Sequence, residues 1–279
     1  MSKHLHFTGE KNMKLFVSGL WVLGVLFSQA LSAGTVFDVE TVSDTGAKRQ
    51  GAIYVQNGKL SMDSVQPGVA MTLMYHSEPE RAILVDHLKQ TYVLISAEEA
   101  TRLARQVNAA KQTMDGLLKF LPAEQQKAMK EVLKGQGVPD LDAELPAIEV
   151  IARGEGELFK EKKTARYDIS EDGVVANRLW IASWEQFPES EQLKSTLLSA
   201  SKFVESIARE LPAVASKYQG TLGSLEKMGG MPVQLERFRA NSQREFSSQV
   251  TGVRSADVAE AAFNPPKGYT LKELPKLPF

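Results

Sequence analysis

The chain has 279 residues, of which 43% are hydrophobic and 24% are charged. This composition is typical of a folded globular protein and excludes a disordered one. The net charge is −1, and because residues 1–33 hold three lysines against one glutamate, the part that follows carries −3. That balance argues against a nucleic-acid partner. No cysteine is present, so disulfides, cysteine-ligated metals and a lipoprotein anchor are excluded.

Residues 1–33 have the features of a secretory signal peptide. A short positive region begins at Met13, the expected true start, and an apolar run of 13 residues follows over 15–27. Small residues then suit signal peptidase, with cleavage near Ser32 or Ala33. An uncleaved anchor is the alternative, but the run is short for a bilayer span and no second one follows. The sequence therefore predicts an exported, periplasmic protein without a transmembrane segment after cleavage.

A meander of antiparallel strands is predicted from Gly51 to Ser96, after a half-buried first strand over 34–42. Asn57-Gly58 lies between two apolar runs and is the strongest short hairpin signal in the chain. The expected strands cover 53–55, 60–62, 71–75, 82–85 and 92–95. Several of them are apolar at successive positions, whereas a sheet facing water would alternate. Something is therefore expected to cover the second face, unless the sheet curls around a cavity.

Two helical insertions are predicted, at about 96–135 and 188–219. The first begins with the capping box Ser96-Ala97-Glu98-Glu99 and continues with apolar residues at spacings of four and three. Pro122 interrupts it, a second stripe follows from residue 128, and a linker extends to Pro146. The second insertion repeats the spacing from Leu193 onwards. Both stripes fit core packing or a lid over an apolar cavity, whereas a membrane-surface helix is disfavoured because their polar faces are mixed in charge.

The remaining segments are predicted to be extended. Asp172-Gly173 marks a second hairpin turn, and Met228-Gly-Gly-Met231 is interpreted as a flexible link. The expected strands or extended segments are 148–152, 163–169, 174–183, 233–239, 244–253 and 268–270. We therefore expect a single α+β domain over 34–279, in which a curved antiparallel sheet packs against two long helical segments.

Residues able to support catalysis or metal binding are sparse. His76 and His87 are the histidines that remain after the leader, and ten residues of separation without a third ligand favour exposed turn histidines over a metal site. Two Met-x-x-Met spacings, at 71–74 and 228–231, are of the kind that can bind copper(I). The first lies on a predicted strand, where residues three apart point to opposite faces, so its two sulfur atoms cannot bind one ion. No nucleophile or phosphate-loop motif occurs. We therefore expect neither an enzyme nor a metal or cofactor site.

Several turn and strand motifs resemble the bacterial family called domain of unknown function 4412, which is similar in fold to the periplasmic lipoprotein-carrier (Lol-type) proteins. The motifs are Gly51-x-Ile53-Tyr54-Val55, Gly58-Lys59-Leu60-x-Met62-Asp63, Ile83-Leu84-Val85-Asp86, Asp172-Gly173, Leu179-Trp180 and Phe263-x-Pro265-Pro266-x-Gly268-Tyr269. The resemblance implies a half-open barrel with helices packed in its concavity. In the carrier group, that concavity shelters acyl chains.

The leading hypothesis is an exported, non-enzymatic binding protein for a lipid or other hydrophobic ligand, because a cavity lined by aliphatic, aromatic and methionine side chains suits such a ligand. The candidate lining residues are Tyr54, Met62, Met71, Leu73, Tyr75, Tyr92 and Leu94. The alternative is a structural or protein-interaction module of the cell envelope, with a filled core and a protein partner. A continuous apolar cavity favours the first hypothesis, and an exposed apolar patch on the helices favours the second.

Overall fold

The computed structural model describes residues 33–64, 69–122, 124–126, 146–157, 159, 161, 163–210 and 224–273. Residues 33–279 belong to one compact unit. Several predictions lie outside the described residues: the signal peptide, the second stripe of the first insertion, the linker before Pro146 and the end of the second insertion.

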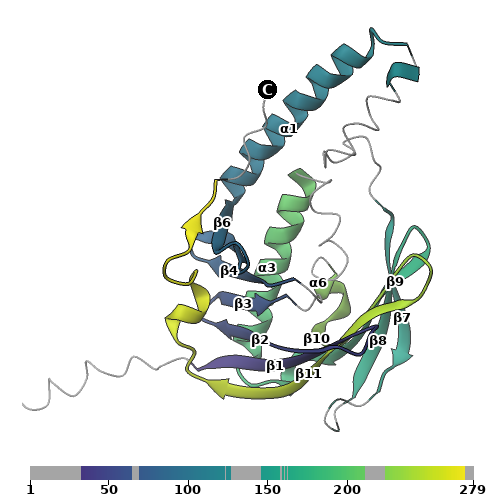
Figure 1. The fold of residues 1–279 in the computed structure, drawn as a ribbon. Helices are drawn as coiled ribbons and strands as arrows, with labels where there is room; N and C mark the ends of the chain where they lie inside the picture. Colours follow the sequence, from purple (N-terminus) through teal and green to yellow (C-terminus); the bar gives the residue numbers. More distant parts are fainter. Residues whose placement is uncertain are drawn as a thin grey trace, which may run out of the picture. The chain divides into compact units, whose positions relative to one another are not determined.

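The described strands form one large sheet (Figure 1). They are β1 (Gly34–Ser43), β2 (Lys48–Gln56), β3 (Lys59–Asp63), β4 (Met71–Ser77), β5 (Glu80–Asp86), β6 (Thr91–Ser96), β7 (Ile148–Glu155), β8 (Thr164–Glu171), β9 (Val174–Ser183), β10 (Gly230–Phe238), β11 (Arg244–Ala256) and β12 (Thr270–Leu271). Their spatial order is β12-β6-β5-β4-β3-β2-β1-β11-β10-β9-β8-β7. The sheet is antiparallel except where β12 pairs with β6, and its two edges remain apart. The predicted α+β class with an open, curved antiparallel sheet is confirmed.

Both predicted hairpin turns are present. Asn57 and Gly58 have φ angles of 50° and 71°, and Asp172 and Gly173 have φ angles of 51° and 80°. Two consecutive residues at positive φ match the twist of the strands on either side, and Asn, Asp and Gly reach this region at the lowest cost. The local sequence therefore sets the register of both hairpins.

Two long helices accompany the sheet, α1 (Ala97–Leu118) and α3 (Ser190–Glu210), together with the short helix α6 (Leu225–Met228) and the 3-10 turns η1 (Trp184–Gln186) and η2 (Glu260–Phe263). The predicted capping box starts α1. The backbone N–H of Glu99 donates to Ser96 Oγ at 3.1 Å, and the Ser96 N–H donates to Glu99 Oε2, also at 3.1 Å. The helix ends at Leu118, ahead of Pro122.

Helix α3 packs on one face of the sheet, which we call the inner face. Its residues Leu193, Leu197 and Phe203 are buried in one cluster with strand residues that include Phe37 and Tyr75. The Phe203 ring lies 5.7 Å from the Tyr75 ring, centroid to centroid. The predicted apolar spacing of this helix is therefore core packing against the sheet.

The opposite or outer face is covered by the C-terminal strap, residues 257–273. Val258 and Phe263 from the strap are buried against Val36 of β1, and Tyr269 packs on a second cluster centred on Ile83. The strap ends by adding β12 to the edge of β6. The expectation that something covers the second apolar face is thus confirmed, because α3 covers one side and the strap covers part of the other.

One expectation was wrong. Met228-Gly-Gly-Met231 is not a flexible link, because Met228 ends α6, Met231 lies in β10, and both side chains are buried in the core. Gly229 takes φ 68° to end the helix. A Cβ on Gly230 would collide with the carbonyl oxygen of Ala182. The two glycines therefore serve a helix cap and a close strand approach.

Replacing Phe203 with alanine should lower the free energy of unfolding by about 3–5 kcal/mol, because it leaves a cavity between α3 and the inner face. Lys202→Ala, at the neighbouring exposed position, should change it by less than about 0.5 kcal/mol. Urea unfolding of both variants measures the difference. Equal losses would contradict the packing described for α3.

Candidate functional site

The structure divides the seven predicted ligand-binding residues between the two faces. Strand register places four of them on the inner face and three on the outer face. The inner set is Met62, Met71, Leu73 and Tyr75. The outer set is Tyr54, Tyr92 and Leu94, which pack against the two clusters under the strap. Sequence reasoning could not separate the sets because both faces of these strands are apolar.

A row of four apolar side chains crosses the inner face from β3 to β6, and we call it the inner row. Its members stand directly opposite one another in successive strands, and all are partly exposed: Met62, Leu73, Leu84 and Val93. Ile53 stands opposite Met62 and extends the row into β2. Strands about 4.8 Å apart make the row about 14 Å long. Sequence reasoning missed Leu84 and Val93, which the antiparallel register alone identifies.

The neighbouring register row lies under α3. Leu60, Tyr75 and Ala82 face one another there and are buried. Tyr75 donates its hydroxyl to Glu80 Oε1 at 3.1 Å, and burial followed by the charge of Glu80 raises the pKa of Tyr75. Tyr75 is therefore a core residue at the margin of the inner row. The exposed row offers contact area without hydrogen-bond donors or acceptors, which suits hydrophobic binding.

The two histidines fasten the strap to the outer face. His76 is buried at 3% exposure, which corrects the expectation of an exposed turn histidine. Its Nε2 lies 2.7 Å from the carbonyl oxygen of Phe263 and donates to it. His87 is half-buried, with Nδ1 3.2 Å from the Tyr269 hydroxyl. Strand β4 and the β5–β6 turn hold these rings where the strap crosses.

The environment of His76 favours the neutral form of its ring. Burial lowers the pKa of His76, the Phe263 carbonyl raises it, and the charges of Arg81 and Lys59 lower it further. Glu260, which pairs with Lys59, raises it in turn. The resulting pKa lies below the ordinary 6.5.

The methionine pairs considered for copper do not form an exposed site. Met71 and Met74 lie on opposite faces of β4 by register, and Met228 and Met231 are buried in the core. Within the described residues, no group of three or more His, Asp or Glu side chains could hold a metal ion. Of the described helices, none is long and apolar enough to cross a membrane.

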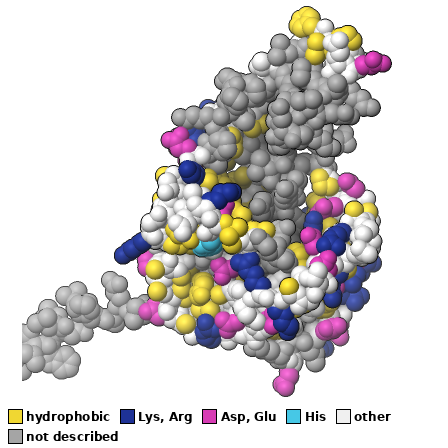
Figure 2. Space-filling view, in the orientation of Figure 1, with side chains coloured by type: hydrophobic (Ala, Val, Ile, Leu, Met, Phe, Trp, Pro, Cys, Tyr) yellow, Lys and Arg dark blue, Asp and Glu magenta, His cyan; other side chains and the backbone are white. Residues whose placement is uncertain are grey.

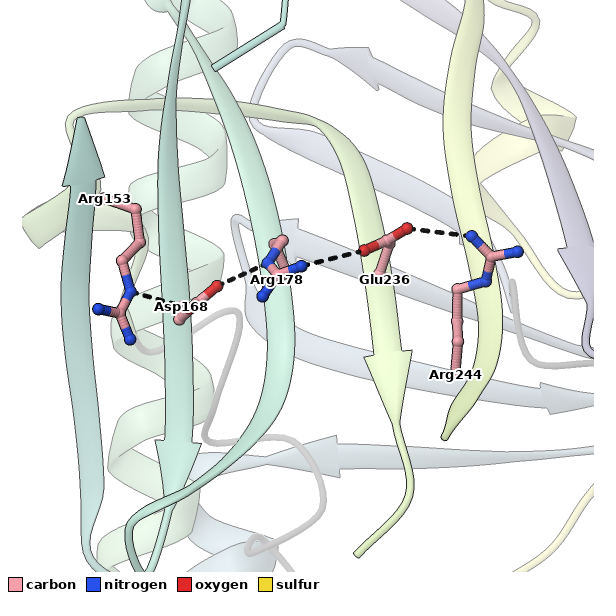
Figure 3. Close-up of polar contacts among 5 residues, drawn as sticks. All are labelled: Arg153, Asp168, Arg178, Glu236 and Arg244. Carbon is pink, nitrogen blue, oxygen red and sulfur yellow. Dashed lines mark hydrogen bonds and ion pairs between the residues drawn. The ribbon is translucent and has the colours of Figure 1, made fainter. Parts of the chain in front are cut away.

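A ladder of five charged residues crosses the outer face from β7 to β11 (Figure 3). Arg153 and Arg178 each donate from Nε to Asp168 at 2.9 Å, and Glu236 joins Arg178 to Arg244. Burial raises the pKa of Asp168, but the hydrogen bonds from Arg178 and Arg153 outweigh it, so the pKa lies below its usual value. The ladder ties neighbouring strands together.

Charges of both signs are mixed on the surface. Lys and Arg side chains lie interspersed with Asp and Glu side chains on the face that Figure 2 shows, so this face presents no field of a single sign. That pattern agrees with the small net charge of the chain.

No protein-family model matches the chain, and no curated protein matches it. A solved structure of an uncharacterized conserved protein from Thermus thermophilus is similar at 10% identity, with 92% of this chain and 99% of that one covered and a TM-score of 0.41. A putative outer membrane lipoprotein-sorting protein domain from Vibrio parahaemolyticus has 9% identity, coverages of 85% and 91%, and a TM-score of 0.33. MucB, in complex with MucA(peri), has 8% identity, coverages of 84% and 55%, and a TM-score of 0.32.

These scores assign the chain to no family. The resemblance to domain of unknown function 4412 therefore stays a prediction, and function has to be argued from the residues of this chain.

Asp168→Asn should lower the free energy of unfolding by about 2–3 kcal/mol. Removing one partner of a buried ion pair leaves the other charges uncompensated, although Arg153 and Arg178 keep some contact with water, which reduces the cost. Asp44→Asn, at the exposed pair with Arg239, is the control and should change stability little. A loss no larger than that of the control would show that the ladder contributes nothing.

The free energy of unfolding should fall as the pH is lowered, because His76 becomes protonated. Because the folded pKa lies below the unfolded value of 6.5, this residue contributes stability that is fully present above about pH 6.5 and is lost as the pH falls towards the folded pKa. His76→Gln keeps a donor for the Phe263 carbonyl but does not titrate. Its free energy of unfolding should therefore fall less than that of the wild type between about pH 7 and pH 5, and parallel curves would contradict the assignment.

Proposed function

We propose that this protein is an exported, non-enzymatic binding protein of the periplasm that holds a lipid or other hydrophobic ligand along the inner row. The observation that carries the proposal is the run of partly exposed apolar side chains at Met62, Leu73, Leu84 and Val93, side by side beyond the margin of α3. Covering about 200 Å² of such surface would contribute roughly 5 kcal/mol. A site that is largely formed in advance loses the least of this gain to ordering on binding.

The chemistry of the row supports binding over catalysis. Its side chains carry no nucleophile, acid or base, and the nearest tyrosine, Tyr75, has its hydroxyl bonded to Glu80. A catalytic site needs such groups close together. The sequence resemblance to domain of unknown function 4412, which is similar in fold to carriers whose concavity shelters acyl chains, points in the same direction.

A structural or protein-interaction module of the envelope is the second candidate. Helix α3 fills the register row beside the inner row, as expected of a filled core. Phe120, just after α1, is 89% exposed, and Leu88 in the β5–β6 turn is 77% exposed. Exposed apolar side chains of this size are available to a protein partner.

Native mass spectrometry of residues 34–279, purified gently from a periplasm, separates the two candidates. A mass excess that denaturation releases as a lipid supports the ligand proposal and identifies the class of cargo. A clean mass, together with no uptake of added fatty acid or phospholipid, overturns it in favour of the interaction module.

Two leucines provide a matched pair of variants. Leu84 and Leu94 are both half-buried and lie on neighbouring strands, but they face opposite sides of the sheet. Leu84→Glu places a charge in the inner row and should weaken binding of a fluorescent fatty acid about tenfold or more. Leu94→Glu should leave binding within about twofold if it folds. Urea unfolding checks the stability of both, and equal weakening would place the ligand elsewhere.

A further inference from the structure

A single cation interrupts the apolar inner face of β1–β6. Arg49 in β2 lies on the same face as Gly51, Ile53 and Val55, because alternate residues of a strand share a face. Register places Thr41 of β1 directly opposite Arg49. Among the described strand residues on the inner face of β1–β6, Arg49 is the one Lys or Arg.

Arg49 borders a shallow hollow that adjoins the inner row. The lining residues are Val39, Thr41, Arg49, Gly51, Ala52, Ile53, Asp63 and Ser64. Gly51 has no side chain at the floor, where an added Cβ would be in ordinary van der Waals contact with Asp63, 3.4 Å from its Cβ and 3.8 Å from Oδ2. Ile53 belongs both to this wall and to the extended inner row, opposite Met62. The hollow therefore forms the β2 end of the proposed ligand site.

The guanidinium of Arg49 has more N–H donors than its described hydrogen bond uses. Its Nη1 donates to the carbonyl oxygen of Val69, and no described carboxylate forms an ion pair with it. A guanidinium carries five N–H groups, and among the described residues the Val69 carbonyl is the partner of one of them, so further donors can serve a ligand. An anion held there would make a charge-assisted hydrogen bond.

Asp63 lines the same hollow, but its oxygens are already engaged. Oδ1 accepts the Thr72 hydroxyl at 2.8 Å, and Oδ2 accepts the Ala52 N–H at 3.3 Å. Register assigns Asp63 and Thr72 to the outer face. Oδ1 is therefore bonded towards the outer face, whereas Oδ2 lies at the wall of the hollow, 3.8 Å from the position of a Cβ on Gly51.

We propose that the ligand of the inner row is an amphiphile with an anionic head group, a carboxylate or a phosphate, and that the head lies against Arg49. This inference rests on the function proposed above. The alkyl chain would run from Ile53 across the inner row to Val93. Four strand intervals of about 4.8 Å give this path a length of about 19 Å, and Arg49 lies four residues before Ile53 in β2, about 13 Å further along the strand. A long, single alkyl chain with its head at Arg49 would therefore cover part of the row.

The test compares ligands that share one chain length and differ in the head group. Palmitate, hexadecyl phosphate and hexadecanol are each titrated against the wild type by displacement of a neutral fluorescent probe. The two anionic ligands should bind about tenfold more tightly than the alcohol. Added salt should reduce this difference in affinity, because it screens the charge of Arg49. The stronger of the two anions identifies the head-group class.

Arg49→Gln removes the charge but keeps a donor for the Val69 carbonyl. It should bring both anionic ligands to the affinity of the alcohol and leave the alcohol unchanged, whereas Arg49→Lys should retain part of the preference. Unfolding midpoints verify that both variants fold.

The outcomes separate the two proposals. Equal binding of acid and alcohol by the wild type, or a preference that survives in Arg49→Gln, overturns the head-group inference and leaves hydrophobic binding intact. Failure of all three ligands to bind overturns both proposals.

Discussion

Strands β4, β5 and β6 carry apolar side chains on both faces, and this constraint shapes the rest of the molecule. Backbone pairing holds these strands in a sheet, but it leaves two apolar surfaces that water would oppose. Helix α3 covers the inner surface through Leu193, Leu197 and Phe203, and the C-terminal strap covers part of the outer one through Val258 and Phe263. Both covering segments come from later in the chain, so the meander depends on long-range contacts.

The candidate site follows from how far this covering extends. A helix is narrower than the face it covers, so α3 buries the register row of Leu60 and Tyr75 and leaves the next row, with Met62 and Leu73, partly exposed. A protein with only a filled core would gain by burying that row as well. The partly exposed row and Arg49, the one Lys or Arg on the inner face among the described strand residues of β1–β6, adjoin the same hollow.

Polar interactions on the outer face hold segments in place. The ladder around Asp168 joins β7 to β11, and His76 bonds the strap to β4. Buried polar groups need partners, and here the partners come from neighbouring strands or from the strap. The inner face carries polar contacts as well, such as Tyr75 with Glu80 and Thr41 with Ser248.

The sequence by itself determined the local features, because they depend on adjacent residues. Asn57-Gly58 and Asp172-Gly173 fixed two hairpins through their tolerance of positive φ, and Ser96 with Glu99 fixed the start of α1. Only the tertiary structure decided which face each apolar residue occupies, because odd and even positions of several strands are both apolar. It therefore separated Met62 and Leu73 from Tyr54 and Leu94, buried His76 under a strap residue 187 positions away, and placed Arg49 in the lining of the same hollow as Ile53.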